Sequence, residues 1–330
     1  MTQFSVLDLV PVRQGGSVSQ AFGAATDLAR KAEELGCKRF WVAEHHAMEG
    51  IAGGATSVVL AHIGNATSRI RIGSGGIMLP NHTPFQIAEQ FGTLDALFPG
   101  RIDLGLGRAP GAGPELQRAL RKNLAQASEY FPQDVVELRA LLTGDVDLPI
   151  KATPGLGAQI EFWMLGSSLF GASLAARLGM PYAFAAHFAP DHLDQALELY
   201  RRDFQPSEAL DTPHVMVAMN VFAADTDEGA RTLASSQQQS FVALRTGNPG
   251  KLPPPIEGYT DTLPAPSRAM LDHLGQAAAM GSPATVRDAV DAFVKRTQAD
   301  EIILCGATYD PEARLRSLEL TIEACETVAV

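Results

Sequence analysis

The feature that most constrains the fold is a regular alternation of short apolar segments with longer amphipathic ones. The apolar segments are typical of strands buried on both faces, and the amphipathic ones are typical of helices. The expected strands are Phe4–Val10, Lys38–Glu44, Arg69–Leu79, Ile102–Gly107, Glu161–Leu165, Pro181–Ala186, His214–Ala223 and Asp300–Cys305. A helix between successive strands indicates a parallel sheet.

Eight strand–helix units in 330 residues predict one α/β domain, residues 1–330, with the architecture of a (β/α)8 TIM barrel. We expect Ser19 to be the N-cap of the first helix and Pro114–Leu142 to form two helices. Residues 246–267 are rich in proline and glycine, which predicts a loop insertion that acts as a mobile lid. A helix over Arg268–Met280 should follow.

A doubly wound nucleotide-binding sheet is the competing architecture. Its signature is a GxGxxG turn directly after the first strand. Residues 11–16 read Pro-Val-Arg-Gln-Gly-Gly and lack that spacing. The barrel is therefore the favoured interpretation.

The second expected strand ends in Glu44, His45 and His46. Barrel enzymes carry their catalytic groups at the carboxyl ends of the strands. Histidine has an unperturbed pKa near neutrality and is suited to proton transfer. His45 is therefore a candidate catalytic residue, the alternative being that both histidines merely solvate a strand end.

Glycines at 73, 75 and 76 interrupt the third expected strand around Ser74. Glycine weakens a strand unless the backbone bulges or a ligand approaches closely. A flat aromatic cofactor lying on the backbone would need such a surface. Ser74, Gly75 and Gly76 are therefore candidate cofactor-binding residues, and a simple bulge is the alternative.

Arg108 ends the fourth strand, and Ser167 and Ser168 follow the fifth, directly before a helix. Arginine suits bidentate phosphate contact, although one arginine could equally be an ion-pair partner. A serine before a helix is usually a cap, but a helix N-terminus also binds anions. Because both elements belong to neighbouring strands of one barrel, a shared phosphate site is the better explanation.

His82 and His187 should face the same barrel mouth and are candidate substrate-pocket residues. His187 could equally be a core histidine with satisfied hydrogen bonds. No metal site is expected, because His45 and His46 should point to opposite faces of a strand. No HExxH motif is present either.

The formal net charge of −11 disfavours nucleic acids and anionic membranes as partners. No apolar stretch approaches the roughly 18 residues of a membrane span, and no signal peptide is evident. The three cysteines are too scattered for a disulfide framework. A cytoplasmic location is therefore expected.

Taken in order, several of these motifs resemble the bacterial luciferase-like flavin monooxygenases (LLM class flavin-dependent oxidoreductases). They are Glu44–His46, Gly73–Pro80, Pro99–Arg108, Ser167–Pro181 and Gly281–Pro283. The resemblance runs over essentially the whole chain and implies a luciferase-like barrel. It also implies use of reduced FMN, supplied by a separate flavin reductase, together with dioxygen (O2).

The resemblance further implies roles for individual residues. His45 matches the histidine of the flavin–oxygen chemistry, Arg108 and Ser168 match the phosphate ligands, and Ser167 matches a neighbour with a backbone contact. The glycines at 75 and 76 match a bulge beneath the flavin ring, often with a non-prolyl cis peptide. Pro110 departs from the family pattern, because proline has no N–H for the phosphate region.

The expected function is that of an FMN-dependent two-component monooxygenase, an oxidoreductase acting on a small organic substrate that the sequence does not identify. One alternative is a deazaflavin (F420)-dependent oxidoreductase of the same fold. The other is a non-catalytic flavin-binding partner subunit. The resemblance, with the apolar helices Ala55–Thr67 and Pro84–Phe98, also suggests a homodimer.

Overall fold

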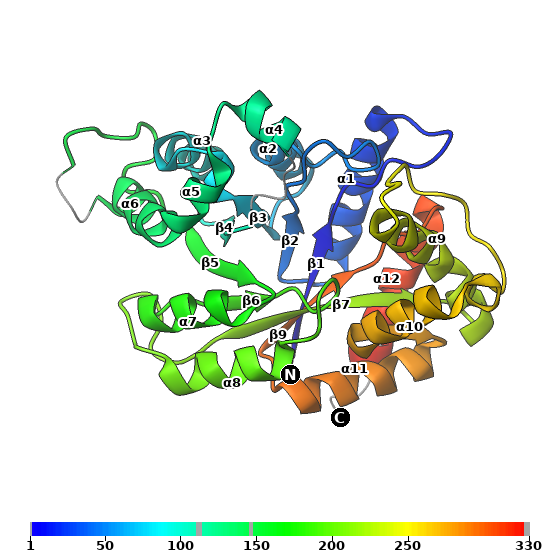
Figure 1. Ribbon diagram of the computed structural model, residues 1–330. Coiled ribbons are helices and arrows are strands. Elements are labelled where there is room, and N and C mark those ends of the chain that lie inside the picture. Colours follow the sequence, from blue (N-terminus) through cyan, green and yellow to red (C-terminus); the bar gives the residue numbers. More distant parts are fainter. Residues whose placement is uncertain (1, 110–113, 145–147, 327–330) are drawn as a thin grey trace.

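The computed structural model describes residues 2–109, 114–144 and 148–326. Its centre is a closed parallel barrel, in which β1 to β7 are neighbours in chain order and β9 closes the ring between β7 and β1. Helices surround this barrel (Figure 1). The predicted TIM barrel is thereby confirmed, with all eight expected strands in place.

The strands are β1 (Gln3–Asp8), β2 (Arg39–Val42), β3 (Arg71–Met78), β4 (Ile102–Gly107), β5 (Glu161–Gly166), β6 (Tyr182–Phe184), β7 (Val215–Ala223), β8 (Ala278–Gly281) and β9 (Glu301–Cys305). The helices are α1 (Val18–Glu34), α2 (Thr56–Ala66), α3 (Pro84–Leu97), α4 (Pro114–Leu120), α5 (Leu124–Glu129), α6 (Phe131–Thr143), α7 (Leu169–Leu178), α8 (Leu193–Asp203), α9 (Asp227–Arg245), α10 (Ala265–Leu274), α11 (Pro283–Thr297) and α12 (Pro311–Glu326). Three short 3-10 turns complete the described elements: η1 (Leu79–Asn81), η2 (Tyr259–Thr262) and η3 (Gly275–Ala277).

The strand β8 is absent from the sequence prediction. The helix expected over Arg268–Met280 ends at Leu274, and the chain then pairs with the last four residues of β7, Asn220–Ala223. β9 pairs with β7 only as far as Asn220, so the end of β7 has a free edge. An Ala-Ala-Met-Gly segment has little strand preference, and this edge supplies the backbone partners that make it a strand.

Two local helix predictions were also wrong. The N-cap of α1 is Ser17 and not Ser19, because Ser17 and Gln20 form a capping box. The expected pair of helices over Pro114–Leu142 is divided into three, α4 to α6, and Asn123 caps the middle one. Sequence periodicity does not mark such short interruptions.

The proline- and glycine-rich segment 246–267 is a loop that contains η2 and runs into the start of α10. It is anchored to the loop after β1. The Leu252 N–H donates to the Val12 carbonyl, and the Gln14 N–H donates to the Leu252 carbonyl. Its movement as a lid stays a prediction.

The surface of the helices bears on two further expectations. No described helix is both long and apolar enough to cross a bilayer. Val58 on α2 and Leu97 on α3 are 69% and 57% exposed. The homodimer expected through these two helices stays a prediction.

A buried ion network fills the end of the barrel where the strands begin. Arg39 lies in the interior of the barrel at 0% side-chain exposure. Its guanidinium lies 2.7 Å from Asp103 on β4, 3.1 Å from Glu161 on β5 and 2.8 Å from Glu301 on β9. Arg71 on β3 also bonds Asp103. One cation from β2 thus connects β4 and β5 with β9, which is not their neighbour in the sheet. The candidate site residues lie at the opposite end, where the strands end.

We predict that Arg39→Leu lowers the free energy of unfolding by about 3–5 kcal/mol, because it leaves Asp103 and Glu301 buried without their main cation. Arg296→Leu is the matched control. Arg296 pairs with Asp194 on the exposed surface, and its loss should cost less than about 1 kcal/mol. Chemical denaturation of both variants measures the difference, and equal costs would contradict a central role for the buried network.

Candidate active site

The candidate site begins where β2 leaves the barrel. Beyond Val42, the Ala43 N–H donates to the Asp8 carbonyl, and the Glu44 N–H donates to the Gly76 carbonyl at 3.4 Å. His45 therefore follows a residue that is bonded to the glycine segment of β3. The two segments that the sequence singled out separately lie side by side.

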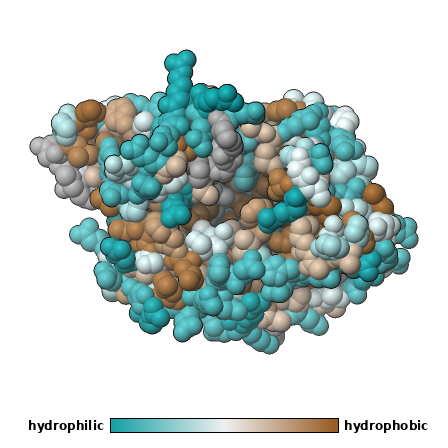
Figure 2. All heavy atoms as spheres, in the orientation of Figure 1, coloured by the Kyte–Doolittle hydropathy of each residue, from teal (hydrophilic) through white to brown (hydrophobic). Residues whose placement is uncertain are grey.

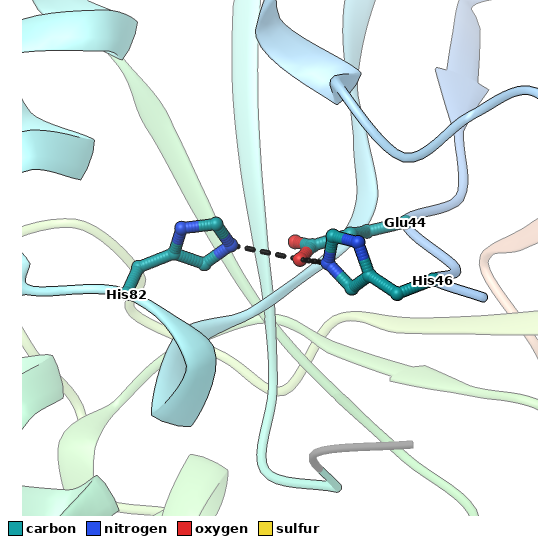
Figure 3. Close-up of side chains that lie close together, drawn as sticks. All are labelled: Glu44, His46 and His82. Atoms are coloured by element: carbon teal, nitrogen blue, oxygen red, sulfur yellow. Dashed lines mark hydrogen bonds and ion pairs between the residues drawn. The ribbon is translucent and has the colours of Figure 1, made fainter. Parts of the chain in front are cut away.

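Glu44 is the centre of a compact polar cluster. Its side chain is 1% exposed, and its Oε1 lies 2.5 Å from His46 Nε2 and 2.7 Å from His82 Nε2. Its other oxygen, Oε2, accepts the Met78 N–H at 2.9 Å. Figure 3 shows the two imidazoles approaching the carboxylate from either side. The carboxylate thus joins the end of β2, the end of β3 and the segment after η1.

The cluster shifts the ionisation of its members. Burial raises the pKa of Glu44, but hydrogen bonds from His46 and His82 outweigh it and hold that pKa at about 2. The bond to Glu44 raises the pKa of His46 against the effect of burial. The cluster therefore contains an ionised carboxylate at neutral pH.

His45 and His187 form a different environment. Burial lowers the pKa of His45, with Glu44 opposing this shift. Burial, and then the charge of His45, lower the pKa of His187 to about 4. Within the described residues, Nδ1 of His187 is buried without a hydrogen-bond partner. His45 thus follows the end of β2 and His187 follows the end of β6, and burial lowers the pKa of each.

The glycine segment of β3 is a β-bulge. The register with β4 shifts between Ser74 and Ile77, and the Gly75–Gly76 peptide bond is cis. The buried Ser74 hydroxyl donates to the Gly105 carbonyl and accepts the Gly105 N–H, both at 3.0 Å. That hydroxyl holds β3 to β4 at the bulge. A contact between Ser74 and a cofactor would therefore be made by the Ser74 backbone and not by its side chain.

Close packing explains why side chains are missing at the bulge. A Cβ on Gly76 would lie 2.7 Å from the Gly105 carbonyl oxygen. A Cβ on Gly75 would lie 2.6 Å from Leu7 Cδ1 and 3.0 Å from the ring of Trp41. The bulge is therefore a bare backbone surface over a packed floor. Both readings of the glycines, a bulge and a surface for a flat ligand, agree with this geometry.

Gly73 lacks a side chain for a different reason. A Cβ at Gly73 would lie 2.5 Å from Cβ of Asp103, one of the carboxylates around Arg39. This glycine makes room for the buried ion network and has no part in the candidate site. The sequence pattern placed Gly73 with the bulge glycines because it carries no information on the strand opposite.

Arg108 directly follows β4, and its side chain contacts the first turn of α7. Its guanidinium carbon is 4.0 Å from the centre of the Phe170 ring, in the first turn of that helix. Among the described residues, no carboxylate forms an ion pair with Arg108. Ser168 is the N-cap of α7, yet its side chain makes no cap hydrogen bond, and Ser167 precedes it. Pro110 lies outside the described residues.

The mouth of the site is partly apolar. Leu169 and Phe170 after β5 and Phe188 after β6 are exposed large hydrophobic side chains. Phe188 also contacts the ring of Phe241 on α9. Figure 2 shows hydrophobic residues around a hollow in the molecular surface. Sequence reasoning did not identify these exposed apolar residues, because isolated apolar residues after strands carry no functional signal.

Sequence reasoning did not predict the cluster around Glu44. The His82 Nε2 is bonded to Glu44, and Lys122 Nζ donates to the His82 carbonyl. The expected place of His82 in a substrate pocket stays a prediction. The argument against a metal site considered only neighbours in sequence. Glu44, His46 and His82 bring three ligand atoms within 4.8 Å of one another. The Glu-His-His run was the available signal, but nothing in it pointed to His82.

We predict that Gly76→Ala destabilises the protein by roughly 1–3 kcal/mol, because the new Cβ would force the Gly105 carbonyl to move. Gly23→Ala, in the exposed face of α1 with no atom near its Cβ position, should instead stabilise by about 0.5–1 kcal/mol. Thermal melts of both variants test the packing of the bulge. A neutral Gly76→Ala would mean that the bulge has unfilled space.

Two solved structures share the fold of this chain. The oxygenating constituent of 3,6-diketocamphane monooxygenase from Pseudomonas putida, solved with FMN, aligns with a TM-score of 0.74 at 20% identity over 100% of both chains. An F420-dependent secondary alcohol dehydrogenase aligns with a TM-score of 0.68 at 15% identity, over 98% of this chain and 99% of that one. At these identities the alignments show a shared fold.

Closer relatives identify the family. The crystal structure of apo-MsnO8 aligns with a TM-score of 0.87 at 33% identity over 98% of each chain. A protein of Escherichia coli (strain K12) named luciferase-like monooxygenase is 47% identical, over 98% of this chain and 97% of its own length. The family model for luciferase-like monooxygenases matches residues 2–301. The chain therefore belongs to the luciferase-like monooxygenase family.

Proposed function

We propose that this protein is a two-component flavin monooxygenase. It takes reduced FMN from a separate flavin reductase and uses O2 to oxidise a small organic substrate. Two features together carry this proposal. One is Arg108, which has no carboxylate partner among the described residues and lies against a helix N-terminus, and the other is a bare glycine bulge in β3. A phosphate and a flat ring are the two parts of FMN that these features match.

The phosphate end is supported by charge and by free donors. Arg108 has no carboxylate partner among the described residues and is held against Phe170. The first N–H groups of α7 and the hydroxyl of Ser168 lie in the same region. A helix N-terminus, a hydroxyl and a guanidinium together favour a phosphate dianion. Ser167 would add a backbone contact, as the family resemblance implies.

The ring end is supported by shape. Gly75 and Gly76 present backbone without side chains, and the floor beneath them is packed. Ser74 keeps the bulge attached to β4 through Gly105. Bound reduced FMN would supply the electrons with which O2 is activated. This part of the chain would orient the ring and exclude water from one of its faces.

His45 is the residue proposed to hold or move a proton. It stands next to Glu44, whose backbone N–H is bonded to Gly76, so it lies beside the proposed ring surface. Its imidazole makes no ion pair of its own among the described residues. His187 follows β6 and would face the same end of the barrel. Proton-transfer groups typically contribute about 10²–10⁴-fold to rate.

Binding of FMN tests the phosphate site. Arg108→Ala should weaken binding of reduced FMN by about 1.5–3 kcal/mol, because a charge-assisted contact is lost. Ser168→Ala should cost less. Anaerobic titration with reduced FMN and with reduced riboflavin, which has no phosphate, measures both effects. If Arg108→Ala weakens riboflavin binding equally, the arginine acts on structure and not on the phosphate.

Oxygen consumption tests the role of His45. With a flavin reductase and a panel of small organic substrates, His45→Ala should keep FMN binding and release hydrogen peroxide in place of oxidised product. His273→Ala, an exposed imidazole on α10, is the control and should behave as wild type. The readouts are O2 uptake, product and peroxide per reduced FMN.

The same assay separates the alternatives. Normal product formation by His45→Ala would remove the proposed role of this histidine. A wild-type protein that binds flavin without O2 uptake, but turns over with reduced F420, would instead be a deazaflavin oxidoreductase. Flavin binding without turnover of either kind would indicate a non-catalytic partner subunit.

A further inference from the structure

The cluster of Glu44, His46 and His82 has no role in the proposed flavin function. Glu44 Oε1, His46 Nε2 and His82 Nε2 lie within 4.8 Å of one another (Figure 3). They come from two segments, the loop after β2 and the residue after η1. Both imidazoles are hydrogen-bonded to the carboxylate. The converging atoms of these three groups could also serve as ligands of a metal ion.

We propose that this cluster is a binding site for a divalent transition-metal ion, with Zn²⁺ as the best match. Two histidines and one glutamate are a ligand set of zinc sites that keep a fourth position open for water or another small ligand. Mg²⁺ and Ca²⁺ prefer oxygen ligands only, and so two imidazole nitrogens select against them. The site does not depend on flavin chemistry.

The charges and supports around the cluster favour a cation. The Glu44 carboxylate is 1% exposed, and its partners at Oε1 are imidazole nitrogens and not a lysine or arginine. Oε2 is fixed by the Met78 N–H, and the carbonyl of His82 is contacted by Lys122 Nζ. Such outer contacts orient metal ligands in known sites. A dication would compensate the buried charge while these contacts remain.

The geometry requires a small adjustment. Zinc–nitrogen and zinc–oxygen bonds of about 2.0–2.1 Å in a tetrahedron place neighbouring ligand atoms about 3.3 Å apart. The two Nε2 atoms now lie 2.5 and 2.7 Å from Glu44 Oε1. Each imidazole therefore withdraws by less than about 1 Å. His46 and His82 are 19% and 24% exposed, so they have room to rotate and an ion can reach them from solvent.

The test uses the full chain without an affinity tag, and Zn²⁺ and Co²⁺ as probes. Isothermal titration with Zn²⁺ should show one site per chain. His46→Ala and His82→Ala should each weaken it at least about tenfold, by analogy with the loss of metal-site contacts. His273→Ala, which removes an exposed imidazole paired with Asp191, should leave it unchanged. Co²⁺ bound to the wild-type chain should give the absorption spectrum of a tetrahedral site.

Each result decides the proposal. Loss of the site in both histidine variants, with melts that remain cooperative, supports it. Equal Zn²⁺ affinity in wild type and both variants would overturn it, as would the absence of saturable binding. The Co²⁺ spectrum needs no substitution, so an octahedral spectrum overturns the proposal even if the variants fail to fold. Flavin binding is measured separately, and its absence has no bearing on these outcomes.

Discussion

A single positive charge buried inside the barrel is the interaction on which the rest of the structure depends. Arg39 pairs with both Asp103 on β4 and Glu301 on β9, two strands that are not neighbours in the sheet. The ring of Trp163 covers its guanidinium at 4.7 Å. Burying charges is costly unless each has its partner, so the strands must keep the register that brings these groups together. The buried ion network fills the barrel interior at the end where the strands begin. The opposite end remains available for binding.

Glu44 connects the barrel strands to the candidate site through its hydrogen bonds. Its backbone is bonded to Gly76, and its carboxylate holds Met78, His46 and His82. The bulge, the strand end and the loop after β3 are thus fixed relative to one another by one side chain. This explains how a bare glycine surface and a pair of imidazoles can be positioned together without regular secondary structure between them.

Much of the fold was predictable, because strand and helix periodicity depends on residues a few positions apart. All eight barrel strands follow from that periodicity, and their number with the chain length indicates closure. β8 was missed because the free edge of β7, and not the local sequence, makes it a strand. Arg108 contacts Phe170 of α7 because the ends of neighbouring parallel strands lie together, and the shared phosphate site stays a prediction. The commitment of the Ser74 hydroxyl to Gly105 was not predictable, because it depends on a shift in register.

The sequence by itself determined the barrel, the excess of negative charge and the kinds of groups at the strand ends. Those properties follow from local pattern and residue chemistry. Only the tertiary structure decided which groups meet. It paired His82 with Glu44 across 38 positions of chain and separated Gly73 from the bulge glycines by setting it against Asp103. Such pairings depend on strand register and on a single bulge, where a shift of one residue exchanges the neighbours of every side chain.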